Sequence, residues 1–210
     1  ELSYIMSLDT DVSKAFDAIH GAIASGNVDN AAAGDFAGTT AGGIDEIVDA
    51  YENDVNNTGK DIKIKLTVTE KNNENASGAA EIAVLAGNKE LAFVDLTLTA
   101  KVGDAPATDI GGANNQLLTI TLPFETEGKE NFVVYRFHGG APEAMTKDPA
   151  SGDEGYKVND GSITVYAKKF STYAIGYTTG SAALVDYTFS KGHNSSWAKD
   201  STRNLVFVCN

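Results

Sequence analysis

From residue 60 onward, hydrophobic and polar residues alternate along the chain with a period of two. The stretch Ile62–Val68 has isoleucine, leucine or valine at every second position and lysine or threonine between them. Alternate side chains of a β-strand point to opposite faces, so this pattern predicts a strand with one buried and one exposed face. Similar hydrophobic runs predict further strands at 91–98, 117–122, 132–137, 156–158, 162–166 and 170–177.

Turn residues separate these predicted strands. Asn159-Asp-Gly161 lies between two of the runs, a combination typical of a tight β-hairpin. Gly139-Gly140 and Pro123 end two others, and a brief pairing is expected over 144–147. About seven short strands with turn residues at regular spacing are typical of an antiparallel β-sandwich.

We therefore predict a mainly β (α+β) fold, with an antiparallel β-sandwich over residues 60–178. Its central strand is expected to be 170–177, with Phe170, Tyr173 and Ile175 in the core.

The first 59 residues have a different pattern and predict a helical lead-in packed on the sandwich. Asp9 or Thr10 can cap a helix that ends near Gly26, because Val, Phe and Ile recur there at helical spacing. Residues 30–43 are small and flexible and are predicted to be a linker or long loop. A short helix is expected over 44–51, and another over 78–86 within the sandwich. Helices this short need to pack against other elements.

The strand pattern restarts in the last segment, residues 179–210. Leu184–Phe189 and Leu205–Val208 read as two strands separated by a polar loop. Two strands cannot bury a core by themselves. This segment is therefore predicted to be either the start of a second module or an extra β-ribbon on the first.

Composition and charge exclude several classes of partner. The chain carries 16 basic and 29 acidic residues, a formal charge of −13, which argues against binding to nucleic acid or to an anionic membrane surface. No run reaches the ~18 apolar residues that a membrane-spanning helix needs, so membrane insertion is not expected. One cysteine, Cys209, excludes an internal disulfide framework and a thiolate zinc site.

An ordered set of strand motifs resembles a known kind of module. The segment Lys168-Lys-Phe-Ser-Thr-Tyr-Ala-Ile-Gly-Tyr177 is similar to a "KFSTYAI-Y" strand that recurs in secreted and cell-wall surface proteins of gut Firmicutes. The other motifs of the set, in chain order, resemble Asp61–Val68, Phe93–Leu98, Leu117–Pro123 and Tyr135–Gly140.

The resemblance covers roughly residues 60 to 178. It implies a repetitive Ig-like spacer or adhesin module, outside the cell or on the cell wall of a Gram-positive bacterium. It implies no catalytic residues. The tail, Tyr187–Lys199 with Leu205–Val208, looks like the start of the Ig-like module that often follows.

The sequence offers few residues for chemistry. The three histidines, His20, His138 and His193, are far apart, and no nucleophile, phosphate-loop or dinucleotide motif is present. We therefore predict no enzyme activity and no cofactor; an enzyme would need a pocket with two facing acids.

Two sets of acidic residues could have a specific role. Asp148, Asp153 and Glu154 form an acidic loop that is a candidate Ca²⁺ site, although the spacing favours a solvated loop. Asp95 lies inside an apolar strand, where a buried acid needs a partner. Arg136 is predicted to supply that partner as a structural ion pair, in preference to a ligand site.

Exposed aromatic side chains are the remaining route to a binding function. The single tryptophan, Trp197, lies in a polar loop and is the candidate ligand residue. The tyrosines at 135, 166, 173 and 177 fall in predicted strands, where packing is the default.

The leading interpretation is a non-enzymatic structural, spacer or adhesion module of a surface protein. Its partners would be neighbouring modules and a host glycan or protein. The alternative is a carbohydrate-binding module, which needs at least two coplanar exposed aromatic rings.

Overall fold

The strands that the alternating pattern predicts assemble into two β-sheets. The computed structural model describes residues 23–112 and 115–179. Two short 3-10 helices, Gly34–Phe36 and Val55–Asn57, connect the other elements. Those elements are β1 (Ala24–Ala32), β2 (Thr40–Gly42), α2 (Ile44–Glu52), β3 (Ile62–Lys71), α3 (Ala79–Ala86), β4 (Glu90–Val102), β5 (Thr108–Asp109), β6 (Leu118–Pro123), β7 (Lys129–His138), β8 (Ala141–Ala144), β9 (Gly155–Asn159), β10 (Ser162–Ala167) and β11 (Thr172–Thr179).

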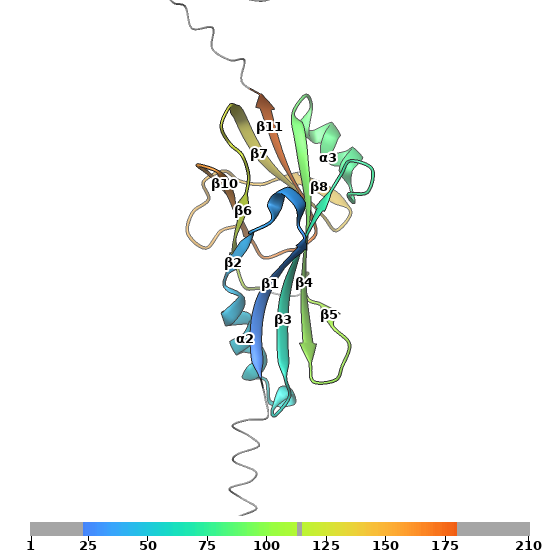
Figure 1. The fold of residues 1–210 in the computed structure, drawn as a ribbon, viewed down its shortest axis with the longest axis vertical. Helices are drawn as coiled ribbons and strands as arrows, with labels where there is room; N and C mark the ends of the chain where they lie inside the picture. Colours follow the sequence, from blue (N-terminus) through green and yellow to red (C-terminus); the bar gives the residue numbers. More distant parts are fainter. Residues whose placement is uncertain (1–22, 113–114, 180–210) are drawn as a thin grey trace, which may run out of the picture. The chain divides into compact units, whose positions relative to one another are not determined.

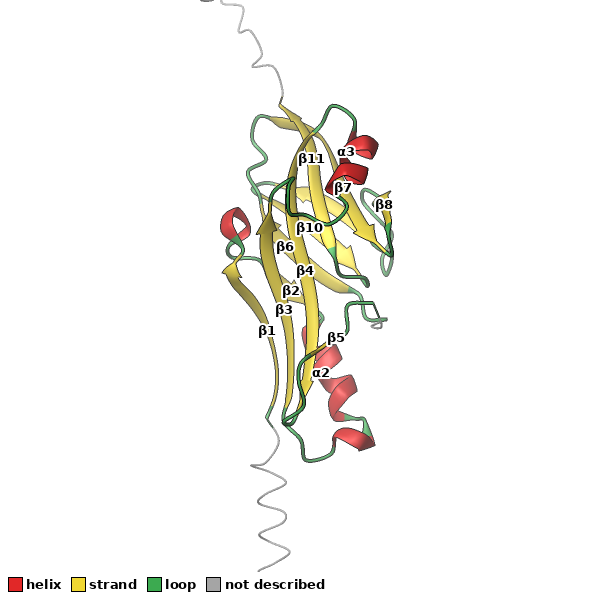
Figure 2. Ribbon diagram, turned by 90° about the vertical axis from the view of Figure 1, so that its right-hand side faces the viewer, coloured by secondary structure: helices red, strands yellow, loops and turns green. Residues whose placement is uncertain are grey.

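The larger sheet has the strand order β1-β3-β4-β11-β7-β8, with the short β5 paired to β4. The smaller sheet has the order β2-β6-β10-β9 (Figures 1 and 2). All pairs within the sheets are antiparallel except β1 and β3, which run parallel. The prediction of a mainly β fold is confirmed, with two sheets among the described residues.

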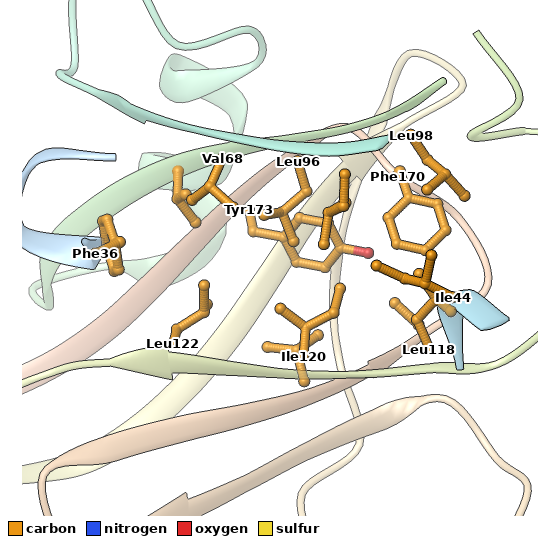
Figure 3. Close-up of a cluster of buried hydrophobic side chains, with 14 of the residues drawn as sticks. Phe36, Ile44, Val68, Leu96, Leu98, Leu118, Ile120, Leu122, Phe170 and Tyr173 are labelled. Carbon is orange, nitrogen blue, oxygen red and sulfur yellow. The ribbon is translucent and has the colours of Figure 1, made fainter. Parts of the chain in front are cut away.

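A single hydrophobic core lies between the two sheets (Figure 3). The inward positions of β3, at 62, 64, 66 and 68, are at most 2% exposed, and the residues between them face the other side. Val68, Leu96 and Tyr173 of the larger sheet meet Ile120 and Leu122 of β6 in this core. The period of two in the sequence therefore reports which face each strand buries.

A second, smaller core lies under α3 on the opposite face of the larger sheet. Ala79, Ile82 and Ala86 of the helix pack with Phe93 and Tyr135 and with Ala174 of β11. Gly78 precedes the helix at φ 70°, and a Cβ there would come within 2.1 Å of the Phe137 ring. Only glycine combines that backbone conformation with such a close approach.

Most predicted elements are confirmed. These include α2, α3, the hairpin at 159–161 and every strand predicted between residues 60 and 178. The prediction that 170–177 is central is confirmed too, since β11 lies between β4 and β7. Phe170, Tyr173 and Ile175 are all buried.

The prediction of a linker over residues 30–43 is wrong. Part of β1, a 3-10 helix and β2 occupy this segment, and both strands join a sheet. Phe36 is only 1% exposed and fixes the segment to the core. The lead-in thus contributes strands as well as helix α2, and the parallel β1–β3 pair makes the larger sheet mixed rather than wholly antiparallel.

Two predictions fall largely on residues that the structure does not describe. Of the helix predicted to end near Gly26, only the last residues are described, and they belong to β1. The two strands and the loop predicted within 179–210 lie outside the described residues.

Shortening a core side chain should destabilise the fold much more than shortening its exposed neighbour. Ile120 is fully buried between the sheets, whereas Thr119 is exposed on the same strand. Ile120→Ala should lower the free energy of unfolding by about 2–5 kcal/mol, and Thr119→Ala by less than about 1 kcal/mol. Urea unfolding followed by circular dichroism measures both; equal losses would contradict the assignment of the core.

Candidate functional site

The structure does not bring the three predicted calcium ligands together. Asp148 has a φ of 50° and its backbone N–H donates to the carbonyl of Tyr156 at 2.8 Å. The N–H of Asp153 donates to the carbonyl of Ala150 at 3.1 Å. Within residues 23–112 and 115–179, no three acidic, histidine or cysteine side chains gather closely enough to hold a metal ion. The calcium site stays a prediction, and the described residues contain no cluster of ligands that supports it.

Glu154 instead binds the guanidinium of Arg136, which is 3% exposed. Nη1 of Arg136 donates to Oε1 of Glu154 at 2.6 Å, and Nη2 donates to Oε2 at 3.3 Å. On the other side, Nε of Arg136 donates to Oε1 of Glu143 at 2.8 Å. The backbone N–H of Lys168 also donates to Glu154, at 2.8 Å. This cluster ties β7, β8 and the segments before β9 and after β10 together.

The pKa values in this cluster follow from burial opposed by ion pairing. Burial favours the neutral form of Arg136, but its hydrogen bonds to Glu154 and Glu143 more than offset this and raise its pKa. Burial likewise opposes ionisation of Glu154, yet the bonds from Arg136 and Lys168 lower its pKa overall. Burial raises the pKa of the neighbouring Tyr173, whose hydroxyl donates to the carbonyl of Lys169. Each charge is therefore stabilised by its partners in a structural role.

The predicted ion pair between Asp95 and Arg136 is wrong. Asp95 lies 3.5 Å from Nζ of Lys71 and accepts a hydrogen bond from the Thr172 hydroxyl at 2.6 Å. Strand β11 separates β4 from β7, and across it Arg136 aligns with Val94, one residue away from Asp95. Adjacent residues of a strand face opposite sides of the sheet. Asp95 therefore lies on the outer face, whereas Arg136 shares the inner side with Tyr173.

A small polar cleft of about 240 Å³ borders Asp95 on this outer face. Serine and threonine residues line it together with Phe137 and His138. The Oγ atom of Ser171 is buried without a hydrogen-bond partner. Both oxygens of Asp95 are already engaged, so the cleft offers hydrogen-bonding groups rather than a free general base.

Most of the described aromatic side chains lie in the core or pack against one another in one group around Phe124. Tyr135 and Tyr173 are buried, as predicted, and Tyr177 packs with Phe124 and Phe132. The rings of this group lie at 39–85° to each other, and the nearly parallel pair, Phe36 with Phe124 at 16°, includes the buried Phe36. These rings do not form a coplanar exposed platform. Trp197 lies outside the described residues.

The path of the chain through the larger sheet is the remaining feature of functional interest. Ala24, at the start of β1, aligns with Ile62, which aligns with Val102 at the end of β4. Tyr177, near the end of β11, aligns with Glu90 at the other end of β4. β4 has 13 residues, so these points are about 40 Å apart along the strands. The chain therefore enters this sheet at one end and leaves it at the other (Figure 1).

Comparisons with known proteins identify no relative: no protein-family model, no curated protein and no solved structure matches this chain. Among the described residues, no helix has the length and apolar character to span a membrane.

The two glutamates of the Arg136 cluster should contribute unequally to stability. The Glu154 side chain is 26% exposed and that of Glu143 is 51% exposed. We expect Glu154→Gln to destabilise clearly, though by less than the about 3–5 kcal/mol that follows when a buried charge loses every partner. The matched Glu143→Gln should cost less than about 1 kcal/mol.

The stability difference between wild type and Glu154→Gln should depend on pH. The folded-state pKa of Glu154 is lowered, so its stabilising contribution is present above the pKa of an unfolded glutamate, about 4.3. It is lost as the pH falls through the folded-state pKa. Urea unfolding at several pH values should show that wild type loses more stability than Glu154→Gln on acidification from about pH 5. Parallel curves for the two proteins would contradict this role of Glu154.

Proposed function

We propose that this chain is a non-enzymatic structural, spacer or adhesion module of a multidomain bacterial protein that is secreted or held at the cell surface. The observation that carries the proposal is the path of the chain, which enters the larger sheet at one end and leaves at the other end of β4. A module with this path extends a chain by its own length. A module whose entry and exit points were adjacent would add little to the length of the chain.

The contacts that stabilise residues 23–179 are compatible with an extracellular location. Stability comes from the core between the sheets and from the Arg136 cluster, and the only cysteine of the sequence is Cys209. Folding of residues 23–179 therefore needs no disulfide bond and is independent of the redox state of the compartment. The formal charge of −13 favours solubility and mutual repulsion.

The strand motifs quoted from the sequence support the finer parts of the proposal. We propose that the two sheets constitute an Ig-like sandwich, and that the protein belongs to the cell wall or exterior of a Gram-positive bacterium. The resemblance of 168–177 and its companion motifs to surface-protein modules supports both statements. Partners of this kind of module are neighbouring modules of the same chain and a host glycan or protein.

A carbohydrate-binding module is the second candidate, and one observation favours it. Serine, threonine, Asp95 and Phe137 are among the residues that line the cleft, and hydroxyls, carboxylates and aromatic rings are groups that hydrogen-bond to sugars or stack on them. The engaged state of Asp95 and the lack of a coplanar pair among the described aromatic contacts make this the weaker candidate.

Surface exposure in the bacterium that encodes the chain tests the proposal. Antibodies against residues 23–179 should label intact cells or detect the protein in the medium, while an antibody against a cytosolic protein should label only permeabilised cells. Labelling confined to permeabilised cells, with none in the medium, would contradict it. In a glycan array, a signal that is lost in Asp95→Ala but kept in Asp104→Ala would favour the carbohydrate-binding alternative instead.

A further inference from the structure

Four neighbouring strands connect the two points where the chain enters and leaves the larger sheet. They are β1, β3, β4 and β11, in that spatial order. β1 and β3 are parallel, and β4 is antiparallel to both β3 and β11. Strands β1, β3 and β11 therefore run in one direction, from the end where the chain enters toward the end where it leaves.

Tension applied to Ile23 and Thr179 acts along these strands. It pulls β1 backward from its first residue and β11 forward from its last. Hydrogen bonds run perpendicular to the strands in the antiparallel pairs and slanted across them in the parallel β1–β3 pair. This force therefore shears each ladder and loads its bonds together. The register joins seven residue pairs between β1 and β3, ten between β3 and β4 and six between β4 and β11.

Additional hydrogen bonds hold the chain where the force would enter. The backbone N–H of Ile23 donates to Oδ1 of Asp61 at 3.0 Å, and its carbonyl accepts from the N–H of Ile62 at 2.9 Å. Farther along β1, Asp29 forms an ion pair with Lys65 of β3 at 3.3 Å. These contacts fasten a strand whose own side chains bury little surface.

The last residues of β11 are fastened in the same manner. The hydroxyl of Thr179 donates to Oε1 of Glu90 at 3.1 Å. The side-chain amide of Asn131 donates to the hydroxyl of Thr178 at 2.9 Å, and the hydroxyl of Thr178 donates in turn to the carbonyl of Glu130 at 3.3 Å. Side-chain contacts thus reinforce both ends of the path, independently of the strand pairing.

We propose that β1, β3, β4 and β11 form a shear clamp that resists tension along the chain. The inference deepens the proposed function and rests on it for its biological meaning, because a spacer at a cell surface transmits force between what lies on its two sides. The mechanical resistance itself is a property of the strand arrangement.

Single-molecule force spectroscopy on the full chain, with Cys209→Ser, tests the clamp in two pulling geometries. Handles on Ile23→Cys and Thr179→Cys load the ladders in shear. Handles on Ile23→Cys and Lys60→Cys pull β1 and β3 apart from the same end, because Ile23 and Ile62 are hydrogen-bonded neighbours. This second geometry loads the residue pairs one after another.

At equal force, the shear geometry should have a lifetime before the first unfolding step at least about tenfold longer, which corresponds to about 1.4 kcal/mol in the barrier. Both double-cysteine proteins must first show the same thermal midpoint without force. Equal lifetimes, or a shorter lifetime in shear, would overturn the proposal.

A matched pair of acidic residues tests the reinforcement at Ile23. Asp61→Ala removes the bond to the Ile23 N–H, whereas the nearby Asp104 is exposed and its side chain has no hydrogen-bond or ion-pair partner within residues 23–112 and 115–179. In the shear geometry, Asp61→Ala should shorten the lifetime severalfold and Asp104→Ala should leave it unchanged. Equal effects of the two variants on the lifetime would contradict a role of Asp61 in the clamp.

The clamp and the proposed function can fail separately. A long lifetime in shear from a protein that never reaches the cell surface would keep the clamp and reject the proposed location. A surface protein whose lifetimes are equal in the two geometries would keep the location and reject the clamp.

Discussion

Burial of the inner face of the larger sheet against β6 and β10 is the constraint on which the rest of the structure depends. Inward residues from both sheets, such as Leu66, Leu96, Ile120 and Val165, are fully buried. A shift of one residue in any of these strands would turn its hydrophobic side chains outward. The core therefore fixes the register, and the register fixes where every charged side chain of the sheet must lie.

The Arg136 cluster shows the consequence of this constraint. The register places Arg136 on the inner side with Tyr173, where an unpaired charge would be costly. Glu143 meets it from the adjacent strand, and Glu154 from the segment before β9. The acidic segment that contains Glu154 is thus held against the sheet by an arginine, and the Glu154 carboxylate pairs with a buried charge. The same register places Asp95 on the outer face, beside Lys71 and Thr172.

Much of the fold could be predicted from the sequence because the core uses strict alternation. Strands such as β3 and β4 are long, and their buried side chains are large and hydrophobic. β1 carries small and polar residues in Ala24–Ala32 and buries little surface, so no alternation of hydrophobic and polar residues predicts it. Its parallel pairing with β3 depends on the tertiary structure. One of the two partners of Arg136 could have been predicted from the sequence. A two-residue turn at Gly139-Gly140 aligns Arg136 with Glu143 on the next strand. Glu154, 18 residues away, had no comparable local signal.

The central claim is that the chain passes through the larger sheet from one end of β4 to the other. A distance between spin labels on Ile23→Cys and Thr179→Cys, with Cys209→Ser, measures this most directly by pulsed electron paramagnetic resonance. Ala24 and Tyr177 lie twelve residue steps apart along β4, and the labelled positions lie one and two residues farther out, so the register predicts one narrow distribution centred at roughly 50 Å. A distribution centred at about half that distance or less would place the two points near each other and contradict the account.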